Sequence, residues 1–305
     1  MTPHHHSTTH HEAAGRPATL AGTIALGGDL SVNRMGFGAM RITGSGVFGP
    51  PRDRQEAIRV LRRAVELGVN FIDTADSYGP YVSEELIAEA LYPYPEGLVI
   101  ASKGGLERPG PSKWEPRGEP KYLRRELEGS LRRLRLERID LWQLHRIDSA
   151  VPEDEQLATL ADFVKEGKVR HIGLSEVDVD EIQRAQRFVD VVSVQNRYNV
   201  FDRRWEPIVE YCEAHRMAFI PWFPLGAGKL HSEVDEDRAH ERLERVARRH
   251  EASVMQVALA WLLARSPSML VIPGTSKVRH LEENVAAAEL ELDDDDIQVV
   301  ETAIA

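Results

Sequence analysis

Four side chains that can hold or donate protons follow three short apolar runs of the sequence. They are Asp73, Tyr78, Lys103 and His145. A tyrosine is a poor acid at neutral pH unless a nearby cation stabilises its phenolate, and Lys103 could be that cation. A buried lysine needs an opposite charge, which Asp73 can supply, and His145 can orient a carbonyl or relay its proton. Together they would form a general-acid site for a developing alkoxide, although any one of them could be a structural hydrogen-bonding residue.

No side chain donates hydride, so a redox reaction at this site requires a nicotinamide or flavin cofactor. A metal-dependent hydrolase is the other enzyme class to consider, and it would need several histidine and carboxylate ligands at the strand ends. Only His145 and Asp73 qualify. We therefore expect no metal site.

Short β-rich runs alternate with longer helical patterns, which is typical of βα units around a parallel sheet. One helical pattern spans Arg54 to Leu67 and ends at Gly68, and another spans Val254 to Ala264. No GxGxxG motif follows an expected strand, which disfavours an open doubly wound sheet. Eight strands instead favour an α/β fold of the closed (β/α)8 TIM-barrel type. They are Met35–Met40, Phe71–Ala75, Leu98–Ser102, Ile139–Leu144, Val169–Leu174, Val191–Val194, Met217–Pro221 and Met269–Ile272.

A turn-rich segment precedes the first of these strands. Thr23–Leu26 and Leu30–Val32 flank Gly27-Gly28-Asp29, which has the turn chemistry of a β-hairpin. We therefore predict an N-terminal β-hairpin that caps the barrel. In a TIM barrel the active site lies at the C-terminal ends of the strands. Those ends carry the four residues above together with Ser175, Gln195 and Asn196.

Composition restricts the class of protein further. The 38 basic and 49 acidic residues give a net charge of −11, which argues against a nucleic-acid partner. The single cysteine, Cys212, excludes an intramolecular disulfide, and its expected state is a small buried thiol. No apolar stretch is long enough to span a membrane and no signal peptide is evident, so we expect a cytoplasmic protein. The oligomeric state stays open.

The two ends of the chain differ in character. Residues 1–17 are polar and rich in histidine, and we expect a disordered tail that resembles an expression tag, with a metal site as the weaker interpretation. Residues 18–305 should form a single barrel domain. Asp293 to Asp296 precede an apolar pattern, which favours the acidic start of a last helix over a calcium site.

Short motifs mark the ends of the expected strands: Gly36–Met40, Phe71–Gly79, Ser102-Lys103, Leu144-His145, Ile172–Ser175, Gln195-Asn196, Pro224–Gly226 and Ile272–Ser276. In order and spacing they resemble the aldo-keto reductases, from the hairpin to the last helix. The resemblance implies that Asp73, Tyr78, Lys103 and His145 are a catalytic tetrad. Tyr78 would donate the proton, Lys103 and Asp73 would adjust the acidity of Tyr78, and His145 would position the carbonyl.

The same resemblance implies a nicotinamide site. Ser175, Gln195 and Asn196 resemble the residues that hold the carboxamide, and Trp222 resembles the aromatic residue that stacks on the ring, with core packing as its alternative. Further cofactor residues implied by the family motifs are Gly38 and Met40, and Pro224, Leu225, Gly226, Gly228 and Lys229 in the loop over the pyrophosphate, which could otherwise be a plain turn.

The segment from Gly274 to Asn284 resembles the part of the family that holds the adenosine 2′-phosphate. Many members have a lysine and an arginine where this chain has Gly274 and His280. However, Thr275 or Ser276 could cap a helix near Lys277 and Arg279, with no acidic residue in its first turn. This favours NADPH over NADH, although the two cations could be solvated surface residues. The implied cofactor set also includes Glu283 and Asn284.

The substrate is less constrained. The chain ends soon after its last helix, which leaves an open pocket, and the longest candidate wall is Gly104–Gly118, a lid-like loop with Leu106 and Trp114. Trp114 could equally be a packing anchor. Thr43–Arg54, Tyr78–Pro80 and Ala90–Tyr94 resemble the bacterial branch of the family that includes NADPH-dependent pyridoxal reductases. A small carbonyl compound, such as pyridoxal reduced to pyridoxine, is the expected substrate. The alternative is a non-catalytic, nicotinamide-binding regulatory subunit, since related proteins are β subunits of potassium channels.

Overall fold

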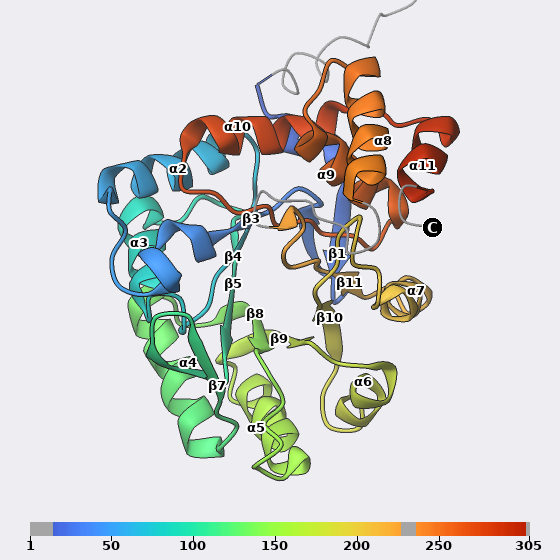
Figure 1. Cartoon of the computed structure of the whole chain (residues 1–305). Coiled ribbons are helices and arrows are strands. Elements are labelled where there is room, and N and C mark those ends of the chain that lie inside the picture. The colour runs from blue at the N-terminus through green and yellow to red at the C-terminus, as the bar shows by residue number, and fades with distance from the viewer. Residues whose placement is uncertain (1–14, 227–235, 303–305) are drawn as a thin grey trace, which may run out of the picture.

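A curled sheet of parallel strands surrounded by helices forms the centre of the protein (Figure 1). The structure is a computed structural model, and it describes residues 15–226 and 236–302. The strand order is β11-β10-β9-β8-β5-β4-β3. This is the (β/α)8 barrel that the sequence predicts, and that prediction is confirmed. The strands are β3 (Phe37–Gly38), β4 (Phe71–Asp73), β5 (Val99–Gly104), β8 (Ile139–Leu144), β9 (Val169–Ser175), β10 (Val191–Gln195) and β11 (Ala218–Phe219).

The eighth predicted strand, Met269–Ile272, does not form a regular strand and instead closes the barrel through isolated bridges. Met269 bridges Phe219 on one side, and Val271 bridges Met35 on the other. Backbone hydrogen bonds reinforce this seam, with Val271 N donating to Arg34 O at 2.9 Å. The expected first strand is likewise reduced to β3, because the backbone turns into a short 3-10 helix, η2 (Ala39–Ile42), directly after Gly38.

Two glycines permit the close approach of the backbones at the seam. A Cβ atom on Gly38 would lie 2.6 Å from the carbonyl oxygen of Ile272, and one on Gly274 would lie 2.6 Å from the carbonyl oxygen of Gly38. A side chain at either position would force the neighbouring backbone to shift. Both glycines therefore favour the close approach that completes the barrel, whatever else they bind.

The helices pack around the outside of the barrel, and the ends of α2 and α11 follow the sequence signals. Asp53 caps α2 by accepting from Glu56 N at 2.9 Å, and Gly68 follows its C-cap at φ +90°. Asp293 caps the last helix, as its acidic run predicts. Burial raises the pKa of Cys212 to about 12, so this thiol is unreactive in the fold. The helices are α2 (Arg54–Glu66), α3 (Val82–Leu91), α4 (Pro120–Leu134), α5 (Glu153–Lys165), α6 (Val179–Ala185), α7 (Glu206–Ala214), α8 (Glu236–Arg249), α9 (Val254–Arg265), α10 (Val278–Ala286) and α11 (Asp294–Glu301).

The predicted N-terminal hairpin is present as β1 (Thr23–Leu26) and β2 (Leu30–Asn33). Its residues Leu26 and Val32 are buried and join the apolar cluster that fills the inside of the barrel, with residues such as Phe71, Leu141 and Ile220. The hairpin therefore seals the end of the barrel opposite the polar strand ends. Of the predicted tail, residues 1–14 lie outside the described part of the chain.

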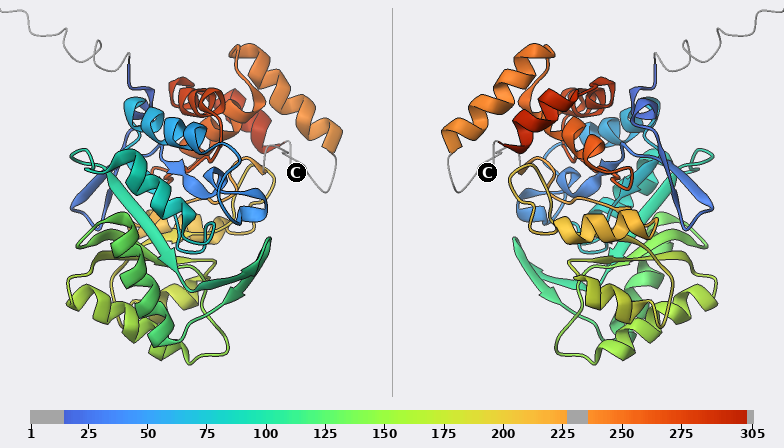
Figure 2. Two further views of the ribbon diagram at one scale, coloured as in Figure 1. Left: turned by 90° about the vertical axis from the view of Figure 1, so that its left-hand side faces the viewer. Right: turned by 90° about the vertical axis from the view of Figure 1, so that its right-hand side faces the viewer.

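The segment Gly104–Gly118, for which the sequence predicts a lid-like loop, contains regular strands instead. It forms an antiparallel hairpin of β6 (Leu106–Gly110) and β7 (Lys113–Pro116), with its turn at Pro111 and Ser112, where φ is +56°. Figure 2 shows this hairpin standing out from the barrel. None of the helices in the described ranges is long and apolar enough to cross a membrane.

Candidate active site

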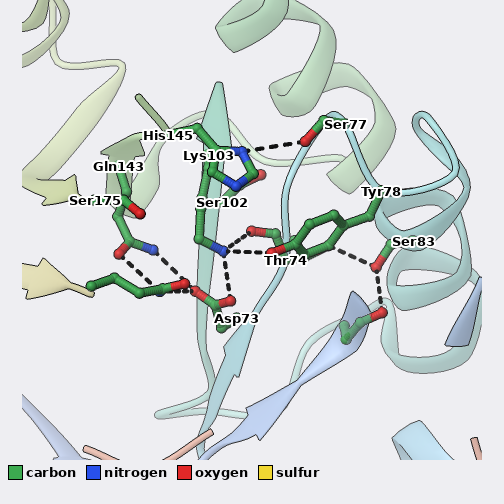
Figure 3. Close-up of polar contacts among 12 residues, drawn as sticks. Asp73, Thr74, Ser77, Tyr78, Ser83, Ser102, Lys103, Gln143, His145 and Ser175 are labelled. Carbon is green, nitrogen blue, oxygen red and sulfur yellow. Dashed lines mark hydrogen bonds and ion pairs between the residues drawn. The ribbon is translucent and has the colours of Figure 1, made fainter. Parts of the chain in front are cut away.

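Four side chains from three consecutive parallel strands and the segments after them meet at the open end of the barrel (Figure 3). Asp73 ends β4, Lys103 lies near the end of β5, and His145 directly follows β8. Tyr78 comes from the segment between β4 and α3. All four are buried, with at most 6% of any of them exposed. Parallel strands bring their C-terminal ends to one edge, which is why residues distant in sequence converge here.

A chain of hydrogen bonds joins three of them. The Lys103 ammonium donates to Asp73 Oδ2 at 2.6 Å, to the Thr74 carbonyl at 2.9 Å and to Tyr78 Oη at 3.3 Å. All three ammonium protons are thereby used, and the buried charge of Lys103 is both paired and hydrogen-bonded.

Burial and these hydrogen bonds together set the protonation states of Lys103 and Tyr78. Burial alone would lower the pKa of Lys103, but Asp73 and Tyr78 outweigh it and raise this pKa above its ordinary value. Burial also raises the pKa of Tyr78, and the opposing effect of Lys103 does not overcome it. Tyr78 is therefore a neutral phenol at neutral pH, with a permanent cation beside its oxygen. A phenol so placed holds a proton and has a cation ready for the negative charge left when the proton departs.

His145 lies edge-on to Tyr78, with 5.9 Å between the ring centroids. Burial lowers the pKa of His145 well below 6.5, and the cations Lys103, Arg146 and Arg108 lower it further. The imidazole is therefore neutral at neutral pH. Its Nδ1 lies 3.3 Å from the hydroxyl oxygen of Ser77.

Two glutamines support the carboxylate of Asp73. Gln143 Nε2 and Gln195 Nε2 donate to Asp73 Oδ1 at 3.0 and 2.9 Å. In this structure the amide of Gln195, expected to hold a carboxamide, orients Asp73. Asn196 is also used internally, because its amide bonds both the N–H and the C=O of Val177. These two bonds hold the segment that follows β9 in place.

Ser175 ends β9 at the open end of the barrel, as predicted, and its hydroxyl oxygen accepts from Arg146 Nη1 at 2.9 Å. The same Nη1 contacts the carbonyl oxygen of His145 at 2.5 Å. Arg146 was not singled out from the sequence. Its position directly after His145 was the available signal, since that position is at a strand end.

Arg108 is a second residue that sequence reasoning missed, and it connects three segments beside the site. Its guanidinium donates to the carbonyl oxygens of Gly46, Val47, Ser77 and Lys113, each at 2.8 Å. It also stacks on Trp114, 3.5 Å from the ring centroid. Arg108 thus fastens the hairpin β6–β7 to the segment that carries Tyr78.

Trp114 lies close to the tetrad. Its ring centroid is 6.3 Å from that of Tyr78 and 6.2 Å from that of His145. Leu106, the other predicted pocket residue, is buried at the base of the same hairpin. The hairpin therefore places an aromatic wall next to the phenol and the imidazole.

The other residues predicted to hold a nicotinamide include Met40, which follows β3, and Trp222 and Pro224, which follow β11. The half-buried Trp222 donates from Nε1 to Glu176 Oε1 at 2.6 Å, which fixes its indole. The half-buried Met40 follows the seam glycine in η2. Pro224 is buried, and Leu225 and Gly226 follow it. Gly228 and Lys229 lie outside the described residues.

The predicted cap of α10 is wrong. The helix begins at Val278, with Lys277 in the N-cap position and no capping side chain of its own, because Thr275 Oγ1 instead accepts from Lys277 N at 3.2 Å. Ser276 is exposed before the helix. The Val278 amide is bonded by Glu56 Oε1 of α2, at 3.2 Å.

The first turn of α10 contains no acidic residue, as the sequence indicates, yet a carboxylate reaches its N-terminus from another helix. The remaining predicted cofactor residues on α10 differ in burial. His280 is exposed, Glu283 is half-buried and Asn284 is buried. Gly274, before the helix, is exposed as well as being a seam residue. Across residues 15–226 and 240–302, no group of three or more histidine, cysteine or acidic side chains could hold a metal ion.

Known proteins share both the sequence and the architecture. The model of the aldo/keto reductase family matches residues 34–305. An uncharacterized oxidoreductase of Schizosaccharomyces pombe is 54% identical over 275 residues, which are 90% of this chain and 87% of that protein. Pyridoxine 4-dehydrogenase of Escherichia coli is 43% identical over 275 residues, covering 88% of this chain and 93% of that one.

Solved structures agree with these relatives. A glycerol dehydrogenase from Gluconobacter oxydans superposes with a TM-score of 0.83 at 27% identity, covering 93% of this chain and 95% of that one. An aldo-keto reductase from Klebsiella pneumoniae in complex with NADPH superposes with a TM-score of 0.77 at 26% identity, covering 92% and 94%.

Proposed function

Because the chain belongs to the aldo/keto reductase family, we propose that it reduces an aldehyde or ketone to an alcohol with NADPH, using Tyr78 as the proton donor. The observation that carries the proposal is the buried hydrogen-bonded chain from Asp73 through Lys103 to Tyr78, next to a neutral His145. When bound, the cofactor supplies a hydride to the carbonyl carbon. The protein supplies the proton that the oxygen then needs.

Each residue of the tetrad has a role that its contacts support. Tyr78 gives its proton to the carbonyl oxygen as negative charge develops there, and Lys103 Nζ, 3.3 Å away, stabilises the phenolate that remains. Asp73 keeps Lys103 charged and in place. The neutral imidazole of His145 donates one hydrogen bond to the same carbonyl oxygen and so orients the substrate. Solvent then returns a proton to Tyr78.

The open end of the barrel fits a nicotinamide cofactor. An indole fixed by Glu176, the hydroxyl of Ser175 and the backbone around Gly226, at φ +54°, supply an aromatic surface, a polar group and a close-approach loop. Exposed Lys277 and Arg279 before and on α10 favour a phosphate there. The Klebsiella pneumoniae neighbour was solved with NADPH, which supports NADPH over NADH. Glu56 acts in the opposite sense, because its carboxylate competes for the same helix N-terminus.

Pyridoxal is the specific substrate that we propose. The support is the 43% identity to pyridoxine 4-dehydrogenase over almost the whole of both chains. The aromatic wall formed by Trp114 suits a flat ring held beside Tyr78. In this reaction the aldehyde carbon gains the hydride and the oxygen gains the proton of Tyr78, which gives pyridoxine and the oxidised cofactor.

The test is the loss of NADPH absorbance with purified protein, with pyridoxal and 4-nitrobenzaldehyde in parallel and NADH as the control cofactor. Turnover of pyridoxal supports the full proposal, whereas turnover of 4-nitrobenzaldehyde alone supports a reductase and overturns pyridoxal. Tyr78→Phe should lose at least about 100-fold in kcat while NADPH binding is unchanged. Tyr94→Phe is the matched control, because it removes a half-buried phenol that bonds the Leu134 carbonyl, away from the tetrad. Equal activity of Tyr78→Phe and wild type, or no turnover with any carbonyl, would favour a non-catalytic nicotinamide-binding subunit.

A further inference from the structure

The hydroxyl of Ser77 lies against the imidazole of His145, and no other side chain bonds that ring in the described part of the chain. We propose that Ser77 is a positioning residue: it donates to Nδ1 of His145 and thereby places the ring proton on Nε2. The inference rests on the proposed reductase function, in which His145 faces the carbonyl oxygen. It assigns a role to a residue that the tetrad does not include.

The need for such a residue follows from the charge around His145. Its neighbours Lys103, Arg108 and Arg146 are cations, and burial already disfavours a charged imidazole. A neutral imidazole carries one proton, on either Nδ1 or Nε2. Only the form protonated on the nitrogen that faces the substrate can donate to a carbonyl oxygen. The other form would present a lone pair to that oxygen and repel it.

The hydrogen-bonding capacity of Ser77 selects between the two forms. Ser77 is 2% exposed, and within the described chain its hydroxyl oxygen has His145 Nδ1 as its one hydrogen-bond partner, at 3.3 Å. If Nδ1 carried the proton, Ser77 would accept it and its own hydroxyl proton would be buried without an acceptor, which is unfavourable. If Ser77 donates, both groups are satisfied and Nε2 keeps its proton.

The backbone of Ser77 is held in place for this task. Arg108 Nη1 donates to the carbonyl oxygen of Ser77 at 2.8 Å and to that of Val47 at 2.8 Å, and the guanidinium is stacked on Trp114. Ser77 also directly precedes Tyr78 in the chain. The proton donor and the group that sets the histidine tautomer therefore share one short segment (Figure 3), which Arg108 holds in place.

Nuclear magnetic resonance of wild-type protein labelled with 15N at the histidine rings tests the tautomer directly, without a variant. The His145 signal is identified by its loss in His145→Gln. We expect a neutral ring with Nε2 protonated and Nδ1 bare. A wild-type ring protonated on Nδ1 would overturn the proposal, whatever the activity of the enzyme.

Steady-state kinetics test the consequence for the reaction. Ser77→Ala should lower kcat about 10- to 100-fold with the NADPH dissociation constant unchanged, and its spectrum should gain the Nδ1-protonated form. Ser77→Thr keeps the hydroxyl and should restore most of the activity and the wild-type spectrum. Ser83→Ala is the matched control, since it removes a buried hydroxyl that bonds Thr74 and the Ala39 carbonyl instead.

The two proposals fail in different ways. A wild-type protein that turns over no carbonyl compound overturns the reductase function. A wild-type protein that turns over substrate, with Ser77→Ala equal to it in kcat and in the tautomer of His145, overturns only the role of Ser77. A fall in kcat of the same size in Ser83→Ala would also overturn it, because loss of any buried hydroxyl nearby would then suffice.

Discussion

Replacing Asp76 with asparagine should stabilise the protein at neutral pH, because the carboxyl group of Asp76 is buried beside two other carboxylates. The residue is 1% exposed, and no side chain in the described part of the chain hydrogen-bonds either carboxyl oxygen. Burial raises the pKa of Asp76 well above 3.8, the nearby carboxylates of Glu84 and Glu126 raise it further, and the smaller opposing effects of Arg133 and the Ser77 backbone do not overcome this rise. The folded protein therefore holds this proton more tightly than the unfolded chain does.

The sign and the size of the effect follow from proton linkage. Below the unfolded pKa of 3.8 both states bind the proton, and the contribution of Asp76 to stability is fully present. As the pH rises toward the folded pKa, unfolding releases a proton and the free energy of unfolding falls by about 1.4 kcal/mol per pH unit. The amide of the asparagine variant cannot titrate. The stability of Asp76→Asn relative to wild type should therefore increase with pH at this slope and level off above the folded pKa.

Urea unfolding followed by tryptophan fluorescence, at several pH values between about 4.5 and 8, measures the difference directly. Asp190→Asn is the control, since Asp190 is exposed in the segment before β10. Its stability should run parallel to that of the wild type at every pH. A constant difference between Asp76→Asn and wild type across this range would refute the reasoning, because Asp76 would then be equally ionised in the folded and unfolded states.

Three further changes test the ion pair, the barrel seam and the cofactor preference. Lys103→Met should lower the free energy of unfolding, measured with urea, by about 3–5 kcal/mol, because it leaves the carboxylate of Asp73 buried without its cation. Adding Asp73→Asn removes that buried charge and should recover much of the lost stability. Gly38→Ala should lower the free energy of unfolding by about 1–3 kcal/mol, because its Cβ would lie 2.6 Å from a backbone carbonyl oxygen. The control Gly110→Ala should change it little, because the nearest atom to its Cβ would be 4.0 Å away. Equal stability of the two variants would contradict the seam geometry. Glu56→Gln should tighten NADPH relative to NADH about two- to fivefold in fluorescence titrations, and an unchanged ratio would show that its carboxylate does not oppose a phosphate.

The sequence predicts the barrel and the convergence of the tetrad because both depend on a repeated local pattern. Each apolar strand ends in a polar residue, and parallel strands bring those ends together. Lys103 and Asp73 could be paired on chemical grounds alone, since a buried ammonium requires a carboxylate. Lys103 lowers the pKa of Tyr78, as the sequence suggests, but the burial that outweighs this effect cannot be seen in the sequence.

Other features depend on contacts that no local pattern encodes. Arg108 bonds four backbone carbonyl oxygens, and any residue type presents such an oxygen, so its partners leave no signature in the sequence. Glu56 reaches the N-terminus of α10 across 222 residues. The strands of the hairpin β6–β7 contain Pro109 and Pro116, which reduce the β-strand signal of that segment.

The hairpin β1–β2 at the other end of the barrel has a consequence for stability. Leu26 and Val32 extend the apolar cluster that fills the inside of the barrel, so the hairpin covers apolar side chains that would otherwise meet water. A segment that contacts none of the four tetrad residues therefore helps to keep the strands that carry them in place.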